Sequence, residues 1–216
     1  MKPIVIELTG LAHSGKDTSA DYLVSTLKAQ GISAIKVGLA DRLKVICQHL
    51  IKLFYGIEIP IEEFYDMEKK EMVRDDYPQF AGKPFKLRTI LQLIGSEVFR
   101  ELLWSGIWCD YVQRNYLTSE KYQVVIMSDC RFPDEINYFK ELERTHEIYE
   151  VISARILRPN REALTGDNQT HQSEIYILTL PVQYEIINDG TKAELYAQLD
   201  NTLLKQIKYL IGLDMV

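Results

Sequence analysis

The sequence predicts an α/β fold with a doubly wound, five-stranded parallel sheet. Apolar stretches of strand length alternate along the 216 residues with amphipathic stretches of helical length. The first strand leads into a glycine-rich segment and then a helix, the start of a strand–helix–strand unit with a right-handed crossover. Such alternation is typical of parallel strands covered by helices on both faces.

The N-terminal part of the chain contains the clearest elements. Residues 3–9 form an apolar run that predicts a buried strand, and residues 16–30 predict a helix that ends at Gly31. A second strand is expected at 33–37 and a helix with one apolar face at 41–54.

The middle of the chain is mostly helical in pattern. Residues 55–86 are broken by glycine and proline into short pieces, and apolar residues from Leu87 to Leu102 then recur at helical spacing. We expect residues 40–118 to form a helical insertion between two segments of the core domain, residues 1–39 and 119–216. A long helical crossover is the alternative.

The C-terminal half completes the sheet. Residues 123–128 are apolar on both faces, which predicts a central strand, and a helix at 134–145 follows. Further strands are expected at 148–157 and 184–187. A capping box of Thr191 and Glu194 then opens the closing helix.

Composition limits the class of protein. The formal net charge is −6, which argues against a broad basic surface for nucleic acid, and no stretch has the apolar length of a membrane span. Cys47, Cys109 and Cys130 form no C-x-x-C pair, so neither a zinc site nor a disulfide framework is indicated. We expect a single domain in the cytoplasm, or in the host cytoplasm if the chain is viral.

The segment Gly10–Gly15 followed by Lys16 has the pattern of a P-loop. Backbone N–H groups of such a loop bind a phosphate chain, and the lysine adds a positive charge. Thr18 stands two places after Lys16, where its hydroxyl can reach Mg²⁺, while Asp17 intervenes. The pattern predicts an ATP–Mg²⁺ site that also includes His13, Ser14 and Asp17. A chance Gly-Lys turn is the alternative.

Two charged residues follow the predicted central strand. Asp129 and Arg131 stand where ligands bind in open α/β sheets, at the carboxyl end of a strand. Asp129 can hold Mg²⁺ or order the phosphate acceptor, and Arg131 can clamp a phosphate. A solvated pair at a strand end is the alternative.

Other candidates lie in helices and loops. Arg88 can bind a phosphate and Gln92 a base edge, although surface helices also carry arginine for solubility. Asp41 opens another helix, where an ordinary charged helix start is an equal alternative. Trp108 is close to where a base could stack, although tryptophans more often pack in a core. These four are the candidate substrate-binding residues of the insertion.

A basic cluster precedes a polar segment. The cluster consists of Arg155, Arg158 and Arg161, of which the last two fall within residues 158–172. This segment contains few apolar residues, which is typical of a lid. Arginines in a lid can neutralise a transferring phosphoryl group, so Arg158 and Arg161 are candidate catalytic residues. His171 is expected to help hold the lid. A plain basic loop is the alternative.

An ordered series of motifs resembles the phage-type deoxynucleoside monophosphate kinases, which are P-loop nucleotide kinases. The resemblance covers nearly the whole chain and is carried by Ser14-Gly-Lys-Asp-Thr18, Leu39-Ala-Asp-Arg-Leu-Lys44, Leu87-Arg-Thr-Ile-Leu-Gln-Leu-Ile-Gly95, Trp108, Ser128-Asp-Cys-Arg-Phe-Pro133, His171-Gln-Ser-Glu174 and Asn188-Asp-Gly190. The Arg88 helix together with Ser-Asp-x-Arg is the more specific signal.

The resemblance implies transfer of the γ-phosphoryl of ATP to a deoxynucleoside monophosphate, with Mg²⁺. It places Lys16, Thr18 and the loop glycines at ATP–Mg²⁺, and the turn Asn188, Asp189, Gly190 at the adenine. It also implies that the insertion binds the monophosphate and that a lid supplies arginines. The expected binding partners are then small nucleotides, and neither nucleic acid nor a membrane is expected to bind. The resemblance leaves open whether the protein forms a homodimer.

Two other functions remain open from the sequence. Dephospho-coenzyme A kinase and phosphomevalonate kinase share the fold and some motifs, and would differ in the acceptor site. A nucleotide-sensing P-loop module without catalysis is the alternative from another class.

Overall fold

A computed structural model describes residues 3–119, 121–145, 150–159 and 176–213. The chain forms two compact units, one made of Met1–Gly38 with Cys109–Val216 and the other of Leu39–Trp108. The first is called the sheet unit here and the second the helical unit. The division expected from the sequence, with a substrate-binding insertion over residues 40–118 and a lid over 158–172, stays a prediction.

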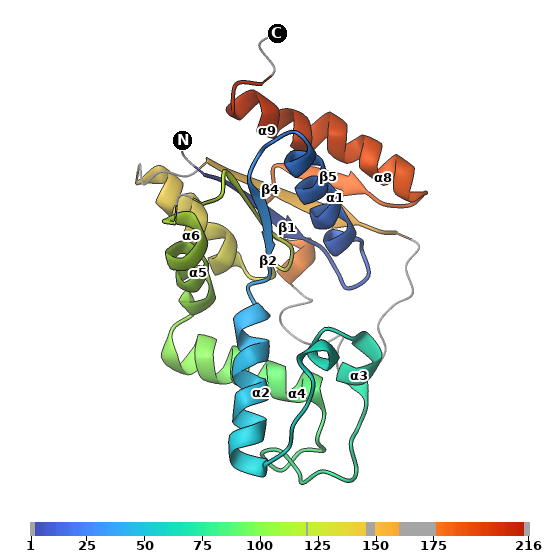
Figure 1. The fold of residues 1–216 in the computed structure, drawn as a ribbon, viewed down its shortest axis with the longest axis vertical. Helices are drawn as coiled ribbons and strands as arrows, with labels where there is room; N and C mark the ends of the chain where they lie inside the picture. The colour runs from blue at the N-terminus through green and yellow to red at the C-terminus, as the bar shows by residue number, and fades with distance from the viewer. Residues whose placement is uncertain (1–2, 120, 146–149, 160–175, 214–216) are drawn as a thin grey trace. The chain divides into compact units, whose positions relative to one another are not determined.

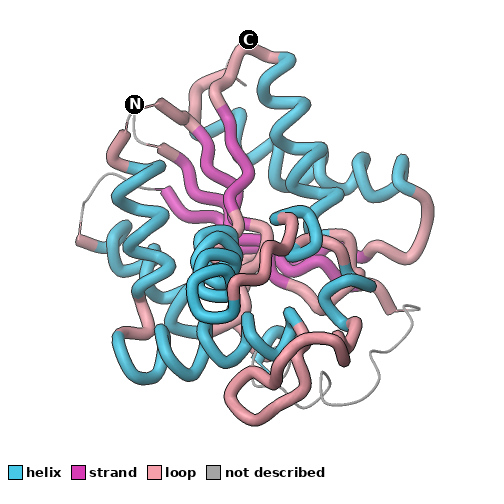
Figure 2. The backbone as a smooth tube through the Cα atoms, turned by 60° about the horizontal axis from the view of Figure 1, so that its bottom comes forward, coloured by secondary structure: helices cyan, strands magenta, loops and turns pink. Residues whose placement is uncertain are grey.

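Among the described residues, the sheet unit contains five parallel strands in the order β2-β3-β1-β4-β5. Figure 2 draws the strands in magenta. Their bounds are β1 (Ile4–Thr9), β2 (Ala34–Val37), β3 (Val124–Met127), β4 (Glu150–Leu157) and β5 (Tyr184–Ile187). This confirms the predicted five-stranded parallel α/β fold.

The register brings all the carboxyl ends of the strands to one edge. Ile4 of β1 pairs with Val124 of β3 and with Glu150 of β4. Each following residue of β1 pairs with the next residue of these two strands, without a bulge, up to Glu7 for β3 and Thr9 for β4. All four residues of β3 are buried, and β3 lies between β1 and β2. The polar segments that follow the strands therefore share one edge of the sheet.

Helices cover both faces of this sheet. Helix α1 (Lys16–Ala29) and the C-terminal helical run lie on one face, and α6 (Pro133–Arg144) lies on the other (Figure 1). The C-terminal run comprises α8 (Lys192–Leu199), η6 (Asp200–Leu204) and α9 (Lys205–Leu210), of which η6 has π-helical hydrogen bonding. Further short elements among the described residues are α5 (Ile107–Val112), η3 (Gln113–Leu117) and η5 (Tyr176–Leu178).

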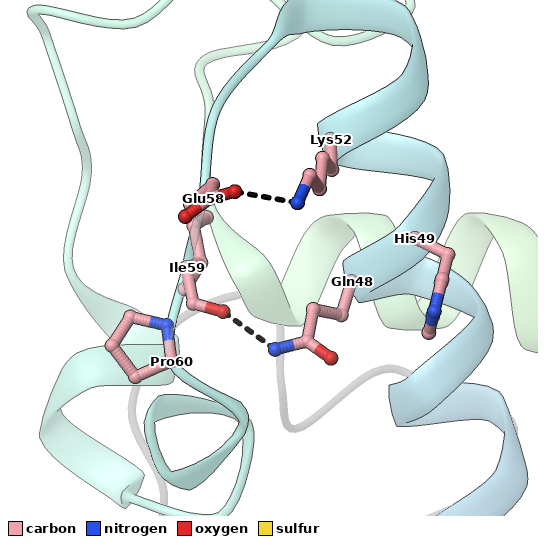
Figure 3. A pocket seen from close by; sticks show the side chains of 6 residues that line it. All are labelled: Gln48, His49, Lys52, Glu58, Ile59 and Pro60. Atoms are coloured by element: carbon pink, nitrogen blue, oxygen red, sulfur yellow. Dashed lines mark hydrogen bonds and ion pairs between the residues drawn. The ribbon is translucent and has the colours of Figure 1, made fainter.

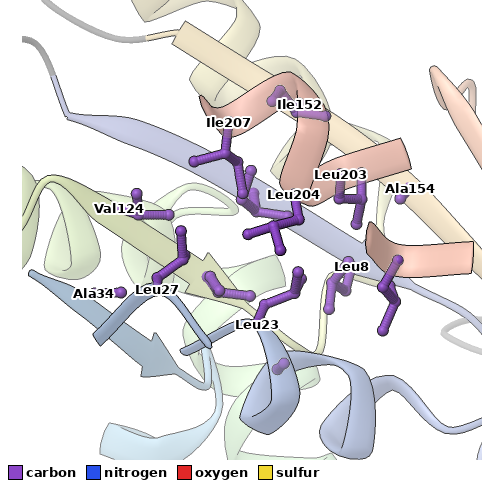
Figure 4. Packing of buried hydrophobic residues seen from close by; sticks show 14 of the residues in the cluster. Leu8, Leu23, Leu27, Ala34, Val124, Ile152, Ala154, Leu203, Leu204 and Ile207 are labelled. Carbon is purple, nitrogen blue, oxygen red and sulfur yellow. The ribbon is translucent and has the colours of Figure 1, made fainter. Parts of the chain in front are cut away.

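A hydrophobic cluster fills the space between the sheet and the helices on the α1 face. Leu23 and Leu27 of α1 pack with Leu203 and Ile207 of the C-terminal run over the strands (Figure 4). The strands contribute residues at alternate positions, as period-two side-chain direction requires; they include Ile4, Ile6 and Leu8 of β1. The core therefore fixes both ends of the segment between β1 and α1.

The helical unit is built from short elements. They are α2 (Asp41–Tyr55), η1 (Ile61–Phe64), α3 (Met67–Glu71), α4 (Leu87–Gln92) and η2 (Leu93–Leu103). A Cβ built on Gly95 of η2 would lie 2.4 Å from Leu43 Cδ2 of α2, so a glycine lets these helices approach. Within residues 55–86, after α2 ends at Tyr55, the helical structure is limited to the short elements η1 and α3, as the glycine and proline positions predicted. No helix among the described residues is both long enough and apolar enough to span a bilayer.

The three cysteines are free and buried, in agreement with the expectation of no disulfide. Burial raises the pKa of the Cys47 thiol to about 12. Burial, with the neighbouring Glu7 carboxyl as a further cause, raises the pKa of Cys130 as well. The Cys47 and Cys130 side chains are therefore neutral thiols of the interior at neutral pH.

Glu7 is a buried carboxyl group in the middle of β1. Its side chain has no solvent exposure, and neither carboxylate oxygen has a hydrogen-bond partner among the residues that the structure describes. It lies on the face opposite Ile6 and Leu8, where α6 supplies the charged neighbours Lys140, Glu135 and Glu143. Desolvation raises the pKa of Glu7 well above its ordinary value, against a smaller lowering by Lys140.

This burial predicts a pH-dependent cost to stability that a Glu7→Gln variant lacks. Above the ordinary pKa the unfolded chain releases the Glu7 proton while the folded chain keeps it. The free energy of unfolding therefore falls as pH rises, by at most about 1.4 kcal/mol per pH unit. Denaturant unfolding of both proteins from pH 5 to pH 8 measures the difference. We expect Glu7→Gln to gain stability relative to wild type as pH rises, and a pH-independent difference contradicts this.

Candidate active site

At two positions of the loop between β1 and α1, the backbone conformation and the surrounding space admit only glycine. Gly10 has φ 147° and Gly15 has φ 104°, and His13 also has a positive φ of 60°. A Cβ on Gly10 would lie 2.5 Å from the Ile156 carbonyl oxygen, and one on Gly15 would lie 2.5 Å from Asn188 Nδ2. Both conformation and space therefore require the glycines that the motif predicted.

Lys16 is the first residue of α1, and its side chain folds back over the loop. Its Nζ donates a hydrogen bond to the Leu11 carbonyl oxygen at 2.8 Å, and the residue is 7% exposed. A positive charge is thus held at the loop backbone beside the N-terminus of a 14-residue helix. This arrangement is suited to an anion such as a phosphate chain.

Two serines near Lys16 carry buried hydroxyl groups. Ser14 Oγ and Ser19 Oγ have no hydrogen-bond partner among the described residues. Ser14 belongs to the loop itself, and its Oγ would be 2.7 Å from a Cβ on Gly10. Buried hydroxyls usually have partners, so an unpartnered one in the loop fits a site that binds a polar ligand.

Asp17 and Thr18 follow Lys16 in the first turn of α1. The Asp17 carboxylate accepts a hydrogen bond from Ser128 Oγ at 3.1 Å and lies 3.6 Å from Lys36 Nζ. Asp17 therefore connects α1 to the ends of β2 and β3. Thr18 is half-buried in the same turn.

Asp129 and Arg131 lie in the segment that joins β3 to α6. The Glu135 carboxylate accepts from the backbone N–H of Arg131 at 2.7 Å and from that of Phe132 at 3.0 Å. The backbone N–H of Cys130 donates to the Leu8 carbonyl oxygen at 3.3 Å. Hydrogen bonds on both sides thus hold this segment beside the end of β1, as the sequence predicted for a strand end.

Asn188 connects the end of β5 to the glycine loop. Its side-chain amide donates to the Ser14 carbonyl oxygen at 2.8 Å, and its backbone N–H donates to the Leu157 carbonyl oxygen at 2.6 Å. Asp189 and Gly190 are exposed in the turn before α8. The predicted capping box of Thr191 and Glu194 is present at the start of α8.

The basic cluster of the sequence is divided in the structure. Arg155 is buried inside β4, where its guanidinium donates to the carbonyl oxygens of Ile177 and Leu180 and pairs with Glu185. Its contacts attach the segment around η5 to the sheet. Arg158 is exposed, and its Nη1 lies 3.4 Å from the His13 carbonyl oxygen of the loop. Arg161 and His171, with most of the predicted lid, lie outside the described residues.

The remaining predicted residues belong to the helical unit. Asp41 accepts hydrogen bonds from Lys44 Nζ at 2.9 Å and from the Tyr65 hydroxyl at 3.0 Å. Trp108 is 6% exposed and packs on Phe99 with ring centroids 5.0 Å apart. Gln92 is half-buried at the end of α4.

Arg88 of the helical unit is paired with a residue that the sequence analysis did not identify. Its Nε donates to the carboxylate of Glu71, the last residue of α3. Glu71 lies in residues 55–86, where short, interrupted elements give no periodic signal. Only the spacing of an acidic residue before a predicted phosphate-binding arginine could have indicated it, and that signal is weak.

A surface pocket of about 460 Å³ also lies in the helical unit (Figure 3). It is lined by Gln48, His49, Lys52, Glu58, Ile59 and Pro60. Lys52 pairs with Glu58 at 2.5 Å, and Gln48 donates to the Ile59 carbonyl oxygen at 2.8 Å. The lining contains no residue that the sequence predicted for a site.

A Gly15→Ala substitution tests whether the loop needs its glycine for space as well as for conformation. Gly31→Ala is the matched control, because Gly31 has φ 77° but a Cβ there meets nothing within 4 Å. The backbone strain is common to both variants and costs about 1–2 kcal/mol. We expect Gly15→Ala to lower the melting temperature further and to abolish ATP binding measured by calorimetry, while Gly31→Ala binds normally. Equal behaviour of the two variants contradicts the close approach to Asn188.

Comparison with known proteins supports the resemblance noted in the motifs. No protein-family model matches the chain. A protein of Acanthamoeba polyphaga mimivirus named "Putative deoxynucleotide monophosphate kinase" is 26% identical over 208 residues, which cover 91% of this chain and 94% of that protein.

Among solved structures, APS kinase CysC of Mycobacterium tuberculosis in complex with AMPPNP and APS is similar with 13% identity and a TM-score of 0.44, over 94% of this chain and 98% of that one. Its Cys556Ala mutant is similar with 12% identity and a TM-score of 0.42, over the same shares. The mimivirus relative confirms what the motifs indicated: over nearly its whole length, this chain is similar to a protein named as a deoxynucleotide monophosphate kinase.

Proposed function

We propose that this chain is a kinase that uses ATP and Mg²⁺ to convert a deoxynucleoside monophosphate into the diphosphate. The observation that carries the proposal is the loop Gly10–Gly15 with Lys16 folded over it, at the shared edge of a parallel sheet. The similarity over nearly the full length to the mimivirus protein supports the same class of reaction.

In this proposal the glycine loop binds the phosphate chain of ATP. The backbone N–H groups of the loop and of the α1 N-terminus donate to phosphate oxygens, and Lys16 exchanges the Leu11 carbonyl for them. Because Lys16 already lies at the loop, its charge needs little reorganisation to act on the transferring group. Asn188, Asp189 and Gly190 are proposed to contact the adenine side of ATP, with Asn188 also holding the loop.

Thr18 and Asp129 are the residues proposed to hold Mg²⁺. Among the described residues no group of three or more His, Cys, Asp or Glu side chains could hold a metal without other ligands. A site with one hydroxyl and one carboxylate fits Mg²⁺, which usually keeps several waters and binds substrate phosphates. When bound, the ion would neutralise charge on those phosphates.

Each unit, taken by itself, contains residues that we propose to bind the acceptor. Asp129 and Arg131 follow β3, and Arg131 can donate two parallel hydrogen bonds to a phosphate. In the helical unit Arg88 is proposed to bind the monophosphate and Gln92 its base edge. Asp41 and Trp108 are proposed to shape the same acceptor site, Trp108 through packing because its ring is buried.

Arg158 and Arg161 are proposed to stabilise the transferring phosphoryl group. Arg158 already lies within 3.4 Å of the loop backbone at His13. A guanidinium there can follow the charge on the phosphoryl oxygens as the transfer proceeds. We therefore expect these arginines to act more on kcat than on the affinity for either nucleotide.

The experiment that tests the function is a side-by-side assay of phosphoryl acceptors. The purified protein is incubated with ATP, MgCl₂ and, in separate reactions, dAMP, dCMP, dGMP, dTMP, dephospho-coenzyme A and phosphomevalonate, and ADP is measured. We expect at least one deoxynucleoside monophosphate to exceed the last two acceptors in kcat/KM. Turnover of dephospho-coenzyme A alone, or ATP binding without any transfer, contradicts the proposal.

Lys16→Ala is expected to lower kcat/KM in this assay about 10²–10³-fold with the fold retained. The reason is the loss of one preorganised charge at the phosphate chain. Circular dichroism and thermal unfolding show whether the variant is folded. A folded Lys16→Ala protein with near-normal turnover contradicts the assignment of the loop.

Thr18→Ala is expected to raise the Mg²⁺ concentration needed for half-maximal activity more than Asp17→Ala does. Thr18 is proposed as a metal ligand, whereas Asp17 already accepts from Ser128 and lies near Lys36. Asp17→Ala should therefore lower the melting temperature and leave the Mg²⁺ dependence nearly unchanged. The reverse order of Mg²⁺ dependence means that the carboxylate, not the hydroxyl, holds the ion.

A further inference from the structure

One carboxylate of the helical unit holds two cationic side chains. Glu71 Oε1 accepts from Arg88 Nε, and Glu71 Oε2 lies 2.5 Å from Lys86 Nζ. The exposed fractions of the side chains are 19% for Arg88, 27% for Lys86 and 32% for Glu71. These groups are partly buried, so the pairs are less screened than ordinary surface ion pairs.

The orientation of the Arg88 guanidinium decides what this arrangement can do. Glu71 uses the Nε side of the group, and Nη2 lies 3.9 Å from Met67 Sδ, a weak acceptor. A guanidinium has five donors in a rigid fork. Contact through Nε therefore keeps the Nη1–Nη2 edge as a second donor pair, which matches two oxygens of a phosphate.

The charges of the cluster also favour an anion. One carboxylate faces the two cations Arg88 and Lys86, so the three groups together carry a net positive charge. A monophosphate carries close to two negative charges at neutral pH. Glu71 thus fixes the arginine without cancelling the attraction for the phosphate.

We propose that Glu71 is a positioning residue for the monophosphate acceptor. It holds the Arg88 guanidinium through Nε so that the Nη1–Nη2 edge binds the phosphate of the acceptor. This inference rests on the proposed function, because it takes Arg88 as the acceptor-binding arginine. It assigns a role to residues 55–86, for which the sequence indicated none.

Two other roles for Glu71 make different predictions. A competing anion, which must leave before the phosphate binds, would weaken acceptor binding, and its removal would tighten it. A purely structural tie between α3 and α4 would lower the melting temperature without a selective effect on the acceptor. Binding and kinetics measured for both nucleotides separate these roles.

The experiment is a double-mutant cycle of Glu71→Ala and Arg88→Ala. Calorimetry measures the Kd of dAMP, dCMP, dGMP and dTMP for wild type, and the tightest binder is then used for each variant. Steady-state kinetics supply KM for that monophosphate, KM for ATP and kcat. Glu68→Ala is the matched control, because Glu68 is an exposed glutamate of the same helix. Glu71→Gln, which keeps an oxygen acceptor for Nε, replaces Glu71→Ala if that protein does not fold.

We expect Arg88→Ala to weaken monophosphate binding roughly 10–100-fold and Glu71→Ala roughly 5–10-fold. In the Arg88→Ala background Glu71→Ala should have no further effect, and KM for ATP and kcat should change less than about threefold. Glu68→Ala should behave as wild type. This pattern supports a role through Arg88.

Three results overturn the inference. They are tighter monophosphate binding by Glu71→Ala, an equal loss from Glu71→Ala with and without Arg88, and no change in monophosphate affinity on Arg88→Ala. Failure of the proposed function is distinct, because wild type would then bind a monophosphate without transferring a phosphoryl group to it. The binding arm of the cycle still decides the role of Glu71 in that case.

Discussion

The hydrogen bond from the Asn188 side chain to the Ser14 carbonyl oxygen connects the end of β5 to the glycine loop after β1. The amide lies so close that a Cβ on Gly15 would be 2.5 Å from its nitrogen. The contact holds the loop at Ser14, directly before Gly15 and Lys16, against the end of β5. Asn188 is held in turn by its own backbone bond to Leu157 at the end of β4.

The parallel sheet supplies the other condition for the site. Because β1, β3, β4 and β5 all end at one edge, the glycine loop, the Asp129–Arg131 segment, Arg158 and Asn188 come together although they are far apart in the sequence. The cluster of Leu23, Leu27 and the C-terminal helices fixes α1 against the same strands. A rigid frame of this kind lets a loop hold charge without reorganisation.

Sequence reasoning succeeded where a pattern is local. The glycine spacing predicted the loop because positive φ leaves little choice of residue, and apolar runs predicted all five strands. It did not separate the buried Arg155 from the exposed Arg158. Arg155 is buried because carbonyl groups of the segment around η5 reach β4 and accept its hydrogen bonds, whereas Arg158 lies at the His13 carbonyl. The raised pKa of Glu7 likewise depends on burial in the folded chain, with charged neighbours from α6 as smaller causes, and the sequence shows neither.

The pairing of Arg88 with Glu71 was beyond prediction for a similar reason. The contact joins residues seventeen positions apart through short elements with no periodic signal. Several hydrogen bonds and ion pairs, rather than a long helix, order this part of the helical unit; Arg74 with Glu63 is another example. Pairwise polar contacts of this kind are specified by three-dimensional placement.

The central claim is that the glycine loop is the ATP site, and amide NMR tests it most directly. Titration of the ¹⁵N-labelled protein with Mg²⁺ and the non-hydrolysable analogue AMPPNP reports which backbone N–H groups meet the nucleotide. The account predicts that the largest shifts belong to residues 10–18, with a second group at 188–190. Largest shifts at residues 48–60, around the pocket of the helical unit, would contradict it.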